Sequence, residues 1–360
     1  MNHDSPSDGT EQEWIGERVA EWLAPIGCTS RWVPEPDGPA RSMVVTLPGH
    51  GGPMVALLGH TDTVFPLGEA ARRPFRREGD RCFGPGVADM KGGVLLAVAA
   101  MERLAAAAER PFSEVRLLVC ADEETRLRAP AVCAEAAGAA AALVFECARA
   151  NGDLVSERKG AVWRTLYLHG RPAHAGADTH RGRSAVSALA REIIRIEGLT
   201  AGRPEMTSVV TTVQAGDSAN TVPGEARATL DIRSSAPEDL LFALAELGRD
   251  GAYDGVTGEI EDRGTWPPMP RTGWLVDLAL SLAGEVGLRI GEQHSGGVSD
   301  GCWTGDDGIP TIDGLGPVGG DDHTPAEWIE IATLEPRIEL AARLVTAVAE
   351  RSIDQLSRGA

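Results

Sequence analysis

The sequence predicts an α/β protein in two parts: an open, mostly parallel sheet with helices on both faces, and an inserted ferredoxin-like module of order β-α-β-β-α-β. Up to residue 145, short apolar runs alternate with helix-like segments, which is typical of strands that are buried on both faces. Near residue 161, apolar and polar residues begin to alternate within the strands, as in half-exposed sheets. The Pro-rich stretch 266–270 marks the return to the first part.

The elements of the first part follow from these apolar runs. The run Val55-Ala56-Leu57-Leu58 is apolar throughout, as expected for a strand inside a parallel sheet. Small residues after Asp89 indicate a helix that this residue opens. In chain order, the expected elements are helix 11–24, strands 41–47 and 54–59, helix 94–108, strand 114–121, helix 129–140 and strand 142–145.

The inserted module is expected over residues 161–265, so that the first part comprises 1–160 and 266–360. Its expected elements are strand 161–169, helix 183–197, strands 207–213 and 225–233, helix 237–248 and a strand near 257–262. Helices near 272–287 and 335–357 belong to the first part again. Only the first ten or so residues are expected to be disordered.

Composition excludes several classes of function. The net charge of −19 argues against nucleic acids and anionic membranes as partners. No apolar run is long enough for a membrane span, and the polar, acidic first residues show no secretory signal. The six cysteines are scattered without a CxxC pair, which indicates reduced thiols and a cytoplasmic protein.

Two histidines and five carboxylates stand in short motifs. They are His60 and Asp62 in Gly59-His60-Thr61-Asp62-Thr63-Val64, Asp89 in Ala88-Asp89-Met90-Lys91-Gly92-Gly93, Glu123 and Glu124 in Ala121-Asp122-Glu123-Glu124-Thr125, Glu146 after Phe145, and His323 before Thr324-Pro325. Imidazoles and carboxylates without thiolates suit zinc or a similar divalent ion. Five or so ligands are too many for one catalytic ion but suit two ions that share a carboxylate.

Each motif alone also has an ordinary explanation. His60 and Asp62 could be a strand-end surface pair, Asp89 a helix N-cap, the Glu123-Glu124 pair a solvated acidic turn, and His323 an exposed loop residue. However, every motif lies at the carboxyl end of an expected strand or in a Gly-rich loop, where open α/β sheets bind ligands. Their joint occurrence favours a two-metal hydrolase. Adjacent residues leaving a strand face opposite ways, so one glutamate of the pair can bind metal while the other faces the substrate water.

At these residues the chain resembles the M20 family of dinuclear zinc peptidases and deacylases, which includes glutamate carboxypeptidase, acetylornithine deacetylase and succinyl-diaminopimelate desuccinylase. The resemblance runs from about Val55 to Trp328 and keeps the motif order. It implies two zinc ions per subunit, which Co²⁺ or Mn²⁺ could replace. It makes Asp89 the bridging carboxylate, His60 and Glu146 the other ligands of one ion, and Glu124 and His323 those of the second. Glu123 would be the general base, and Asp62 the partner of His60.

The resemblance also assigns roles within the inserted module, as a lid that forms a homodimer. His174 would reach the neighbouring subunit's site and stabilise the oxyanion. Asn220 and Arg233 would hold a substrate carboxylate, and the loop at Gly296 and Gly297 would line the substrate pocket. The chain departs from the family after Glu124, where Thr125-Arg126-Leu127-Arg128-Ala129 replaces a segment that commonly carries an early glycine.

The expected activity is therefore hydrolysis of an amide next to a free carboxylate, in an N-acyl amino acid or a short peptide-like conjugate, in the manner of glutamate carboxypeptidase. The alternative within the enzyme class is a biosynthetic N-acyl-amino acid deacylase of the acetylornithine or succinyl-diaminopimelate type. A binding protein that has lost turnover is a second class, but the presence of Glu123 argues against it, because a binder needs no base.

Overall fold

The computed structural model describes residues 1–36, 38–126, 128–249 and 254–359, with side chains up to residue 353. The chain forms two compact units. Unit 1 comprises Met1–Arg158, Met269–Ser295 and Ser299–Ala360, and unit 2 comprises Lys159–Pro268 and Gly296–Val298. The short Gly296–Val298 loop thus belongs to unit 2, although both of its flanks belong to unit 1.

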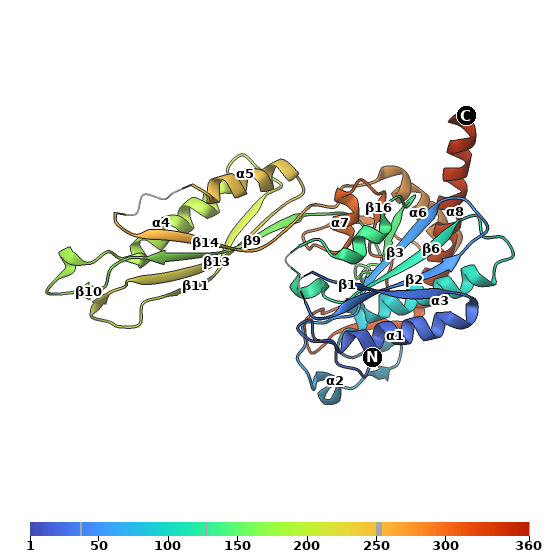
Figure 1. Cartoon of the computed structure of the whole chain (residues 1–360), viewed down its shortest axis with the longest axis horizontal. Helices are drawn as coiled ribbons and strands as arrows, with labels where there is room; N and C mark the ends of the chain where they lie inside the picture. Colours follow the sequence, from blue (N-terminus) through green and yellow to red (C-terminus); the bar gives the residue numbers. More distant parts are fainter. Residues whose placement is uncertain (37, 127, 250–253, 360) are drawn as a thin grey trace. The chain divides into compact units, whose positions relative to one another are not determined.

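Unit 1 is built on a six-stranded mixed sheet in the order β1-β2-β6-β3-β7-β16 (Figure 1). The strands are β1 (Thr29–Pro34), β2 (Arg41–Pro48), β3 (Met54–His60), β6 (Glu114–Cys120), β7 (Ala142–Val144) and β16 (Thr311–Ile312). The pairs β6–β3, β3–β7 and β7–β16 are parallel, whereas β1 and β2 are antiparallel to their neighbours. The predicted α/β class and mostly parallel sheet are confirmed, and the sequence analysis missed β1.

Neighbouring side chains of β3 face opposite layers of unit 1, because successive residues of a strand point to opposite faces. Leu57 packs in the core that includes Met101 and Leu344, whereas Leu58 packs with Val132 on the other face. The helices of unit 1 are α1 (Gln12–Leu23), α2 (Glu69–Arg72), α3 (Gly92–Ala106), α6 (Gly273–Glu285), α7 (Gly301–Asp306) and α8 (Leu334–Gly359). Within the described residues, none of these or the other helices combines the length and apolar character needed to cross a membrane.

The second face carries less helix than the sequence predicts. The predicted helix 129–140 is wrong in extent, because only a short 3₁₀ helix, Ala131–Ala136, forms there. Pro130 precedes it in an extended conformation, and Gly138 has a φ of +81°, which ends helical geometry. This short segment and α7 form the second layer.

Two small pairings complete unit 1. A four-stranded sheet has the order β17-β18-β5-β4, with β4 (Arg76–Glu78), β5 (Arg81–Phe83), β17 (Gly319–Gly320) and β18 (Trp328–Glu330). Strand β8 (Leu154–Arg158) pairs in parallel with β15 (Glu292–Ser295). The small sheet joins a segment near residue 80, which precedes the Asp89 motif, to one near residue 330, which follows the His323 motif.

Unit 2 has the predicted β-α-β-β-α-β order. Its elements are β9 (Gly160–His169), α4 (Ala185–Glu197), β11 (Thr207–Ala215), β13 (Glu225–Ser234), α5 (Pro237–Leu247) and β14 (Thr257–Trp266). The strand order is β11-β13-β9-β14, with every pair antiparallel. Alternate residues of β13, such as Leu230 and Ile232, pack in one core with Leu189 of α4 and Ala243 of α5. A separate pair, β10 (Ala173–His174) and β12 (Thr221–Val222), lies beyond the end of the main sheet.

The N-terminal residues are ordered, contrary to the expectation of disorder. Ser5 and Ser7 are buried, and Pro6 forms a parallel bridge with Thr63. The Thr63 backbone N–H donates to the carbonyl of Ser5 at 2.8 Å. This segment therefore packs beside the loop that follows β3.

We predict opposite effects for alanine at two helical glycines. A Cβ at Gly93 in α3 would lie 1.9 Å from the Phe145 carbonyl oxygen, whereas a Cβ at Gly284 in α6 meets nothing within 4 Å. Gly93→Ala should lower the free energy of unfolding by about 1–3 kcal/mol through overpacking. Gly284→Ala should raise it by roughly 0.4–1 kcal/mol, because alanine restricts the unfolded chain. Thermal midpoints of the two variants measure this, and a Gly93→Ala midpoint at or above that of the unmutated protein would contradict the close approach of α3 to the Phe145 carbonyl, just after β7.

Candidate metal centre

The central strands of unit 1 bring most of the predicted motifs to one edge of the sheet. His60 is the last residue of β3, and Glu146 follows β7 by two residues. Glu123 and Glu124 lie in a 3₁₀ turn, Glu123–Thr125, shortly after β6. Because β6, β3 and β7 are parallel neighbours, their carboxyl ends meet at the same edge.

The small sheet brings the other two motifs to this edge. Strand β5 leads into the turn Val87–Lys91, which carries Asp89, and β18 follows the loop of His323. Their pairing, with Phe83 opposite Trp328, joins the two motifs. His323 itself has a φ of +61°, an uncommon conformation for a residue with a side chain.

The ligand-type side chains form two groups that share Asp89. In the first group, His60 Nε2 lies 2.9 Å from Asp89 Oδ1 and 3.7 Å from Glu146 Oε1. In the second, His323 Nε2 lies 3.0 Å from Asp89 Oδ2 and 3.3 Å from Glu124 Oε1. Each oxygen of Asp89 therefore faces a different histidine, which is how a carboxylate shared between two cations is oriented.

Asp62 has no exposed surface and is held by donors on both oxygens. Oδ1 lies 3.2 Å from His60 Nδ1 and accepts the Glu123 backbone N–H at 3.0 Å. Oδ2 accepts the Ser7 hydroxyl at 2.6 Å and the Glu124 backbone N–H at 3.0 Å. Asp62 thus orients His60 so that Nε2 faces Asp89, and it also anchors the turn of the two glutamates.

The electrostatics of the cluster favour positive charge at the two imidazoles. Burial opposes protonation of His60, but its hydrogen bonds to Asp62 and Asp89 outweigh burial and raise its pKa well above the usual value. Hydrogen bonds to Asp89 and Glu124 raise the pKa of His323 to about 11. Burial, with neighbouring carboxylates, raises the pKa values of Glu123, Glu124 and Glu146. The crowded carboxylates therefore lack compensating charge, as expected where divalent cations bind.

The donor set fits two divalent ions of the zinc type. Each group offers one imidazole and two carboxylates, with one carboxylate in common, and such nitrogen and oxygen ligands suit zinc. Cys147 is adjacent to Glu146, but its thiol donates to the Pro317 carbonyl at 3.3 Å. The cluster can therefore hold two cations and place the carboxylate of Glu123 beside them.

Two supporting residues were missed by the sequence analysis. Glu327, which is fully buried, accepts the backbone N–H groups of Gly86, Ala88 and Asp89 at 2.8–3.0 Å. In the sequence, only its position close after the His323 motif, two residues beyond Pro325, pointed to a role at the site. Ser7 lies in the N-terminal segment that had been expected to be disordered, and no local pattern distinguishes it.

The segment after Glu124, which departs from the family pattern, carries a buried arginine that pairs with Asp122, next to the turn of the two glutamates. Arg126 is 3% exposed and pairs with Asp122 at 2.6 Å and with Asp300. Asp300 immediately precedes α7. Leu127, within the same departure, lies outside the described residues.

His174 and Asn220 lie together at one end of unit 2. Their strands pair, with His174 opposite Thr221, and the Ala175 backbone N–H donates to the Asn220 carbonyl at 2.8 Å. His174 Nδ1 accepts the backbone N–H groups of Gly176 and Ala177, both at 3.1 Å. The hydrogen of a neutral imidazole therefore lies on Nε2, which makes His174 a hydrogen-bond donor at an exposed position.

Arg233 is placed with the Gly296 loop in unit 2. It donates from Nη1 to the Gly296 carbonyl at 2.7 Å and makes a bidentate pair with Asp231 at 2.9 and 3.0 Å. Its guanidinium also lies over the Trp163 ring, 5.5 Å from the centroid. Gly297 belongs to the same loop. These hydrogen bonds engage three of the five N–H groups of Arg233, and Asp231 compensates part of its charge.

Within a single copy of the chain, Arg233 and Asn220 lie far apart. Arg233 lies near the end of the ten-residue strand β13, whereas Asn220 precedes Glu225, where this strand begins. Since a strand rises about 3.3 Å per residue, the length of β13 separates the two by roughly 25 Å. Residues at the two ends cannot contact the same small substrate within one chain.

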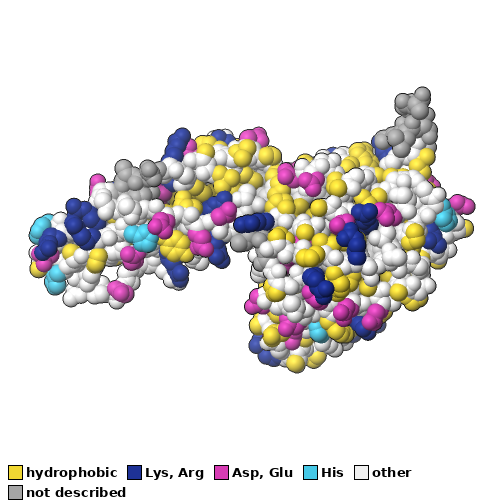
Figure 2. Space-filling view, viewed as in Figure 1, with side chains coloured by type: hydrophobic (Ala, Val, Ile, Leu, Met, Phe, Trp, Pro, Cys, Tyr) yellow, Lys and Arg dark blue, Asp and Glu magenta, His cyan; other side chains and the backbone are white. Residues whose placement is uncertain are grey.

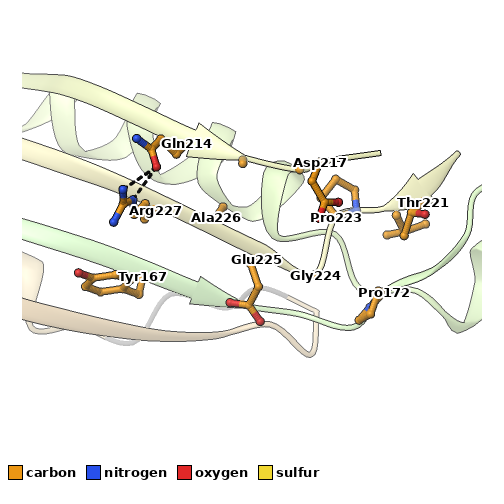
Figure 3. Close-up of a pocket in the computed structure, with 13 residues that line it drawn as sticks. Tyr167, Pro172, Gln214, Asp217, Thr221, Pro223, Gly224, Glu225, Ala226 and Arg227 are labelled. Carbon is orange, nitrogen blue, oxygen red and sulfur yellow. Dashed lines mark hydrogen bonds between the residues drawn. The ribbon is translucent and has the colours of Figure 1, made fainter. Parts of the chain in front are cut away.

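A cavity of about 480 Å³ lies at the His174 end of unit 2 (Figure 3). Its walls include Tyr167, Pro172 and Glu225, together with Arg227, which donates to Gln214 at 2.6–2.9 Å. The side chains that line it include none of the seven histidines and carboxylates of the cluster in unit 1.

Comparison with known proteins identifies close similarity to one peptidase family. The profile of peptidase family M20/M25/M40 matches residues 56–347. Carboxypeptidase G2 of Pseudomonas sp. (strain RS-16) is 29% identical over 317 residues, covering 84% of this chain and 76% of that protein. Succinyl-diaminopimelate desuccinylase of Halorhodospira halophila is 29% identical over 359 residues, covering 92% of this chain and 91% of that protein.

Solved structures share the fold. Aminopeptidase PepT from Bacillus cereus has a TM-score of 0.77 at 20% identity, covering 96% of this chain and 95% of that chain. The Bacillus subtilis YXEP protein, described as a dinuclear metal binding peptidase from the M20 family, has a TM-score of 0.67 at 17% identity, covering 97% and 95%. At these identities the likeness establishes the fold of this chain.

Proposed function

Since the chain belongs to peptidase family M20/M25/M40, we propose that it is a dinuclear zinc hydrolase that cleaves an amide bond next to a free carboxylate. The substrates would be N-acyl amino acids or peptide-like conjugates that lose their C-terminal residue. The observation that carries this proposal is the pair of three-residue groups that share Asp89, one oxygen facing each histidine.

The metal ligands in this proposal are His60, Asp89 and Glu146 for one ion, and Asp89, Glu124 and His323 for the other. Zinc is the proposed native metal, and Co²⁺ or Mn²⁺ could replace it in such a set. When bound, the ions supply Lewis acidity toward a carbonyl oxygen and lower the pKa of a water molecule. Asp62 holds His60 through Nδ1 and so keeps Nε2 directed toward Asp89, with which it would hold the first ion.

Glu123 is proposed to move the proton. Its backbone is fixed by Asp62, and its side chain is buried beside Glu124 and Glu146. Burial and the neighbouring carboxylates raise its pKa, so a carboxylate oxygen of Glu123 can take a proton from the attacking water and later give it to the leaving amine.

Arg233 is proposed to bind the substrate carboxylate in the pocket that the loop at Gly296 and Gly297 lines. Its hydrogen bonds to Asp231 and Gly296 orient the guanidinium, and the N–H groups that these bonds do not use, one on each terminal nitrogen, form a fork that suits a carboxylate. Because Asp231 compensates part of the charge, we expect this contact to contribute orientation more than attraction.

His174 and Asn220 are proposed to act at the site of a second copy of the chain. Their separation from Arg233 by the length of β13 supports this, as does the donor Nε2–H of His174. A homodimer through unit 2 would deliver them. Edge strand β11 exposes Val209 and Val213, and Ile194 of α4 is 75% exposed. Figure 2 shows hydrophobic side chains gathered over the helical layer of unit 2, so this unit offers apolar surface for association.

A biosynthetic N-acyl-amino acid deacylase is the second candidate, because a relative that covers most of the chain is named succinyl-diaminopimelate desuccinylase. Side-by-side rates with N-acyl-glutamate, N-acetylornithine and N-succinyl-diaminopimelate separate the two. A zinc-loaded protein that hydrolyses none of a broad acyl-amino acid panel would favour a binding protein instead. We also propose a cytoplasmic location, on the basis of the six free thiols.

For the metal centre, we predict that zinc-loaded unmutated protein retains about two ions per chain after dialysis, as expected for a shared-carboxylate site. Asp89→Ala should lose both ions, because it removes a ligand of each. Glu146→Ala should retain the ion held by Asp89, Glu124 and His323. Elemental analysis measures the content, and Asp277→Ala, at a side chain that is 79% exposed, is the control. Full metal content in Asp89→Ala would refute the shared ligand.

For the substrate, we predict that free acids are hydrolysed much faster than the same compounds amidated at the carboxylate. Arg233→Lys should raise KM for free acids by roughly tenfold with a smaller change in kcat, because a point charge replaces a bidentate fork. Arg227→Lys, on the same strand but bonded to Gln214, is the matched control. Equal cleavage of amidated and free substrates by the unmutated enzyme would exclude the carboxylate contact.

For the dimer, we predict complementation between two inactive parents. Glu123→Gln should bind metal but lose turnover by at least roughly 10²-fold, and His174→Ala should lack the oxyanion donor. After the two are unfolded and refolded together in equal amounts, about half the dimers should be mixed, with one complete site each, which restores roughly a quarter of the unmutated activity.

The control for complementation mixes Glu123→Gln with Asp89→Ala. Both lesions lie in unit 1, so every site of every mixed dimer keeps one lesion and no activity should return. A mixture of Glu123→Gln and His174→Ala that is dimeric yet inactive would show that His174 does not act across the interface.

A further inference from the structure

We propose that Ser7 is a positioning residue of the metal centre, supplied by the N-terminal segment Met1–Ser7. This inference rests on the proposed two-metal site and extends it to a residue that lies in none of the motifs. Ser7 is 7% exposed, and its hydroxyl donates to Asp62 Oδ2 at 2.6 Å. The residue does not contact the candidate ligands directly; it acts through Asp62.

Backbone hydrogen bonds to Thr63 and Lys91 fix the N-terminal segment near Asp62, and they hold Ser7 in place. Next to Ser7, the carbonyl of Ser5 accepts the Thr63 backbone N–H at 2.8 Å. Further toward the N-terminus, Lys91 Nζ donates to the His3 carbonyl at 3.0 Å. Lys91 lies two residues after Asp89, so the segment spans from the loop after β3 to the turn that carries the shared carboxylate.

Additional contacts fix the start of the segment. The carboxylate of Asp4 accepts the backbone N–H groups of Gly68 and Ala70 at 2.8 and 2.7 Å. The side-chain oxygen of Asn2 accepts the Phe75 backbone N–H at 2.6 Å. With these bonds the first seven residues pack against the segment between β3 and β4.

Ser7 completes the set of donors around Asp62. An ionised carboxylate accepts about four hydrogen bonds, and four donor groups lie within 3.2 Å of the Asp62 carboxylate, two at each oxygen. One of them, His60 Nδ1, also lies 3.1 Å from the Asp62 backbone carbonyl. Three of the four come from His60, Glu123 and Glu124, the residues that Asp62 orients. Ser7 is the only one of these four donors that Asp62 does not itself orient. It therefore fixes the carboxylate independently of the groups that the carboxylate holds.

Loss of the Ser7 hydroxyl would leave Oδ2 of a fully buried carboxylate with the Glu124 N–H alone among the described residues. The Asp62 carboxylate could then rotate. Its contacts with His60 Nδ1 and the Glu123 backbone N–H would weaken, so the contact with the Asp62 carbonyl alone would orient the His60 ring. The expected effect is therefore weaker metal binding and slower turnover, rather than weaker substrate binding. Removal of such supporting contacts typically costs 10–100-fold in metal affinity or activity.

The test compares two serines of the same segment in the full-length, zinc-loaded protein. Ser7→Ala should weaken zinc affinity, measured by competition with a chelator, by about tenfold, the lower end for a supporting contact. Its kcat should fall to a similar extent, while KM stays within about twofold of the unmutated value. Ser5→Ala is the matched control, because the Ser5 side chain is buried and its hydroxyl has no hydrogen-bond partner among the described residues.

A second pair of variants separates positioning from folding. Ser7→Thr keeps the hydroxyl and should retain zinc affinity, whereas the equally shaped Ser7→Val should behave as Ser7→Ala. The proposal is overturned if Ser7→Ala matches Ser5→Ala in zinc affinity and kcat. It is also overturned if Ser7→Ala and Ser7→Val fail to fold while Ser7→Thr folds, since the hydroxyl would then serve folding. Failure of the unmutated protein to hold zinc would instead refute the proposed function itself.

Discussion

The carboxylate of Asp89 lies between two imidazoles, His60 on one oxygen and His323 on the other, and the arrangement of unit 1 can be understood from this contact. The parallel sheet supplies His60, Glu146 and the two glutamates at one edge, whereas the small sheet supplies Asp89 and His323. Glu327 joins the two motifs that the small sheet supplies, because it follows the His323 loop and accepts the backbone N–H of Asp89 itself. The two groups can share Asp89 because the six-stranded sheet and the small four-stranded sheet bring their motifs to the same edge.

A second constraint is the compensation of buried negative charge. Asp62 is surrounded by four donors, and the cation of Arg126 lies between Asp122 and Asp300. In contrast, burial raises the pKa values of Glu123, Glu124 and Glu146, so these carboxylates lack equivalent partners in the protein. Bound divalent cations would compensate the charge of these carboxylates.

Unit 2 carries the residues that we propose for binding the substrate carboxylate and for stabilising the oxyanion at two places that one small substrate cannot span. Arg233 is oriented by Asp231 and Gly296 at one end of β13, and His174 is oriented by two backbone N–H groups beyond the other end. If both sets serve the same reaction, they must come from different copies of the chain. The proposed roles in unit 2 thus require two copies of the chain, whereas one copy of unit 1 supplies all the candidate metal ligands.

The sequence by itself determined the α/β class, the order of elements in unit 2 and the seven motif residues of the candidate site, because apolar periodicity and short motifs are local signals. The division of these residues into two groups came from the resemblance to the family. Prediction failed where local signals compete or are absent. The alanine-rich stretch 129–140 suggested a helix, but Pro130 and Gly138 restrict it to Ala131–Ala136. Only the tertiary structure placed Ser7 on Asp62, 55 residues away, and Glu327 on the backbone of Asp89, 238 residues away. Which donor a buried carboxylate finds depends on how distant segments pack, and no local pattern of residues encodes that choice.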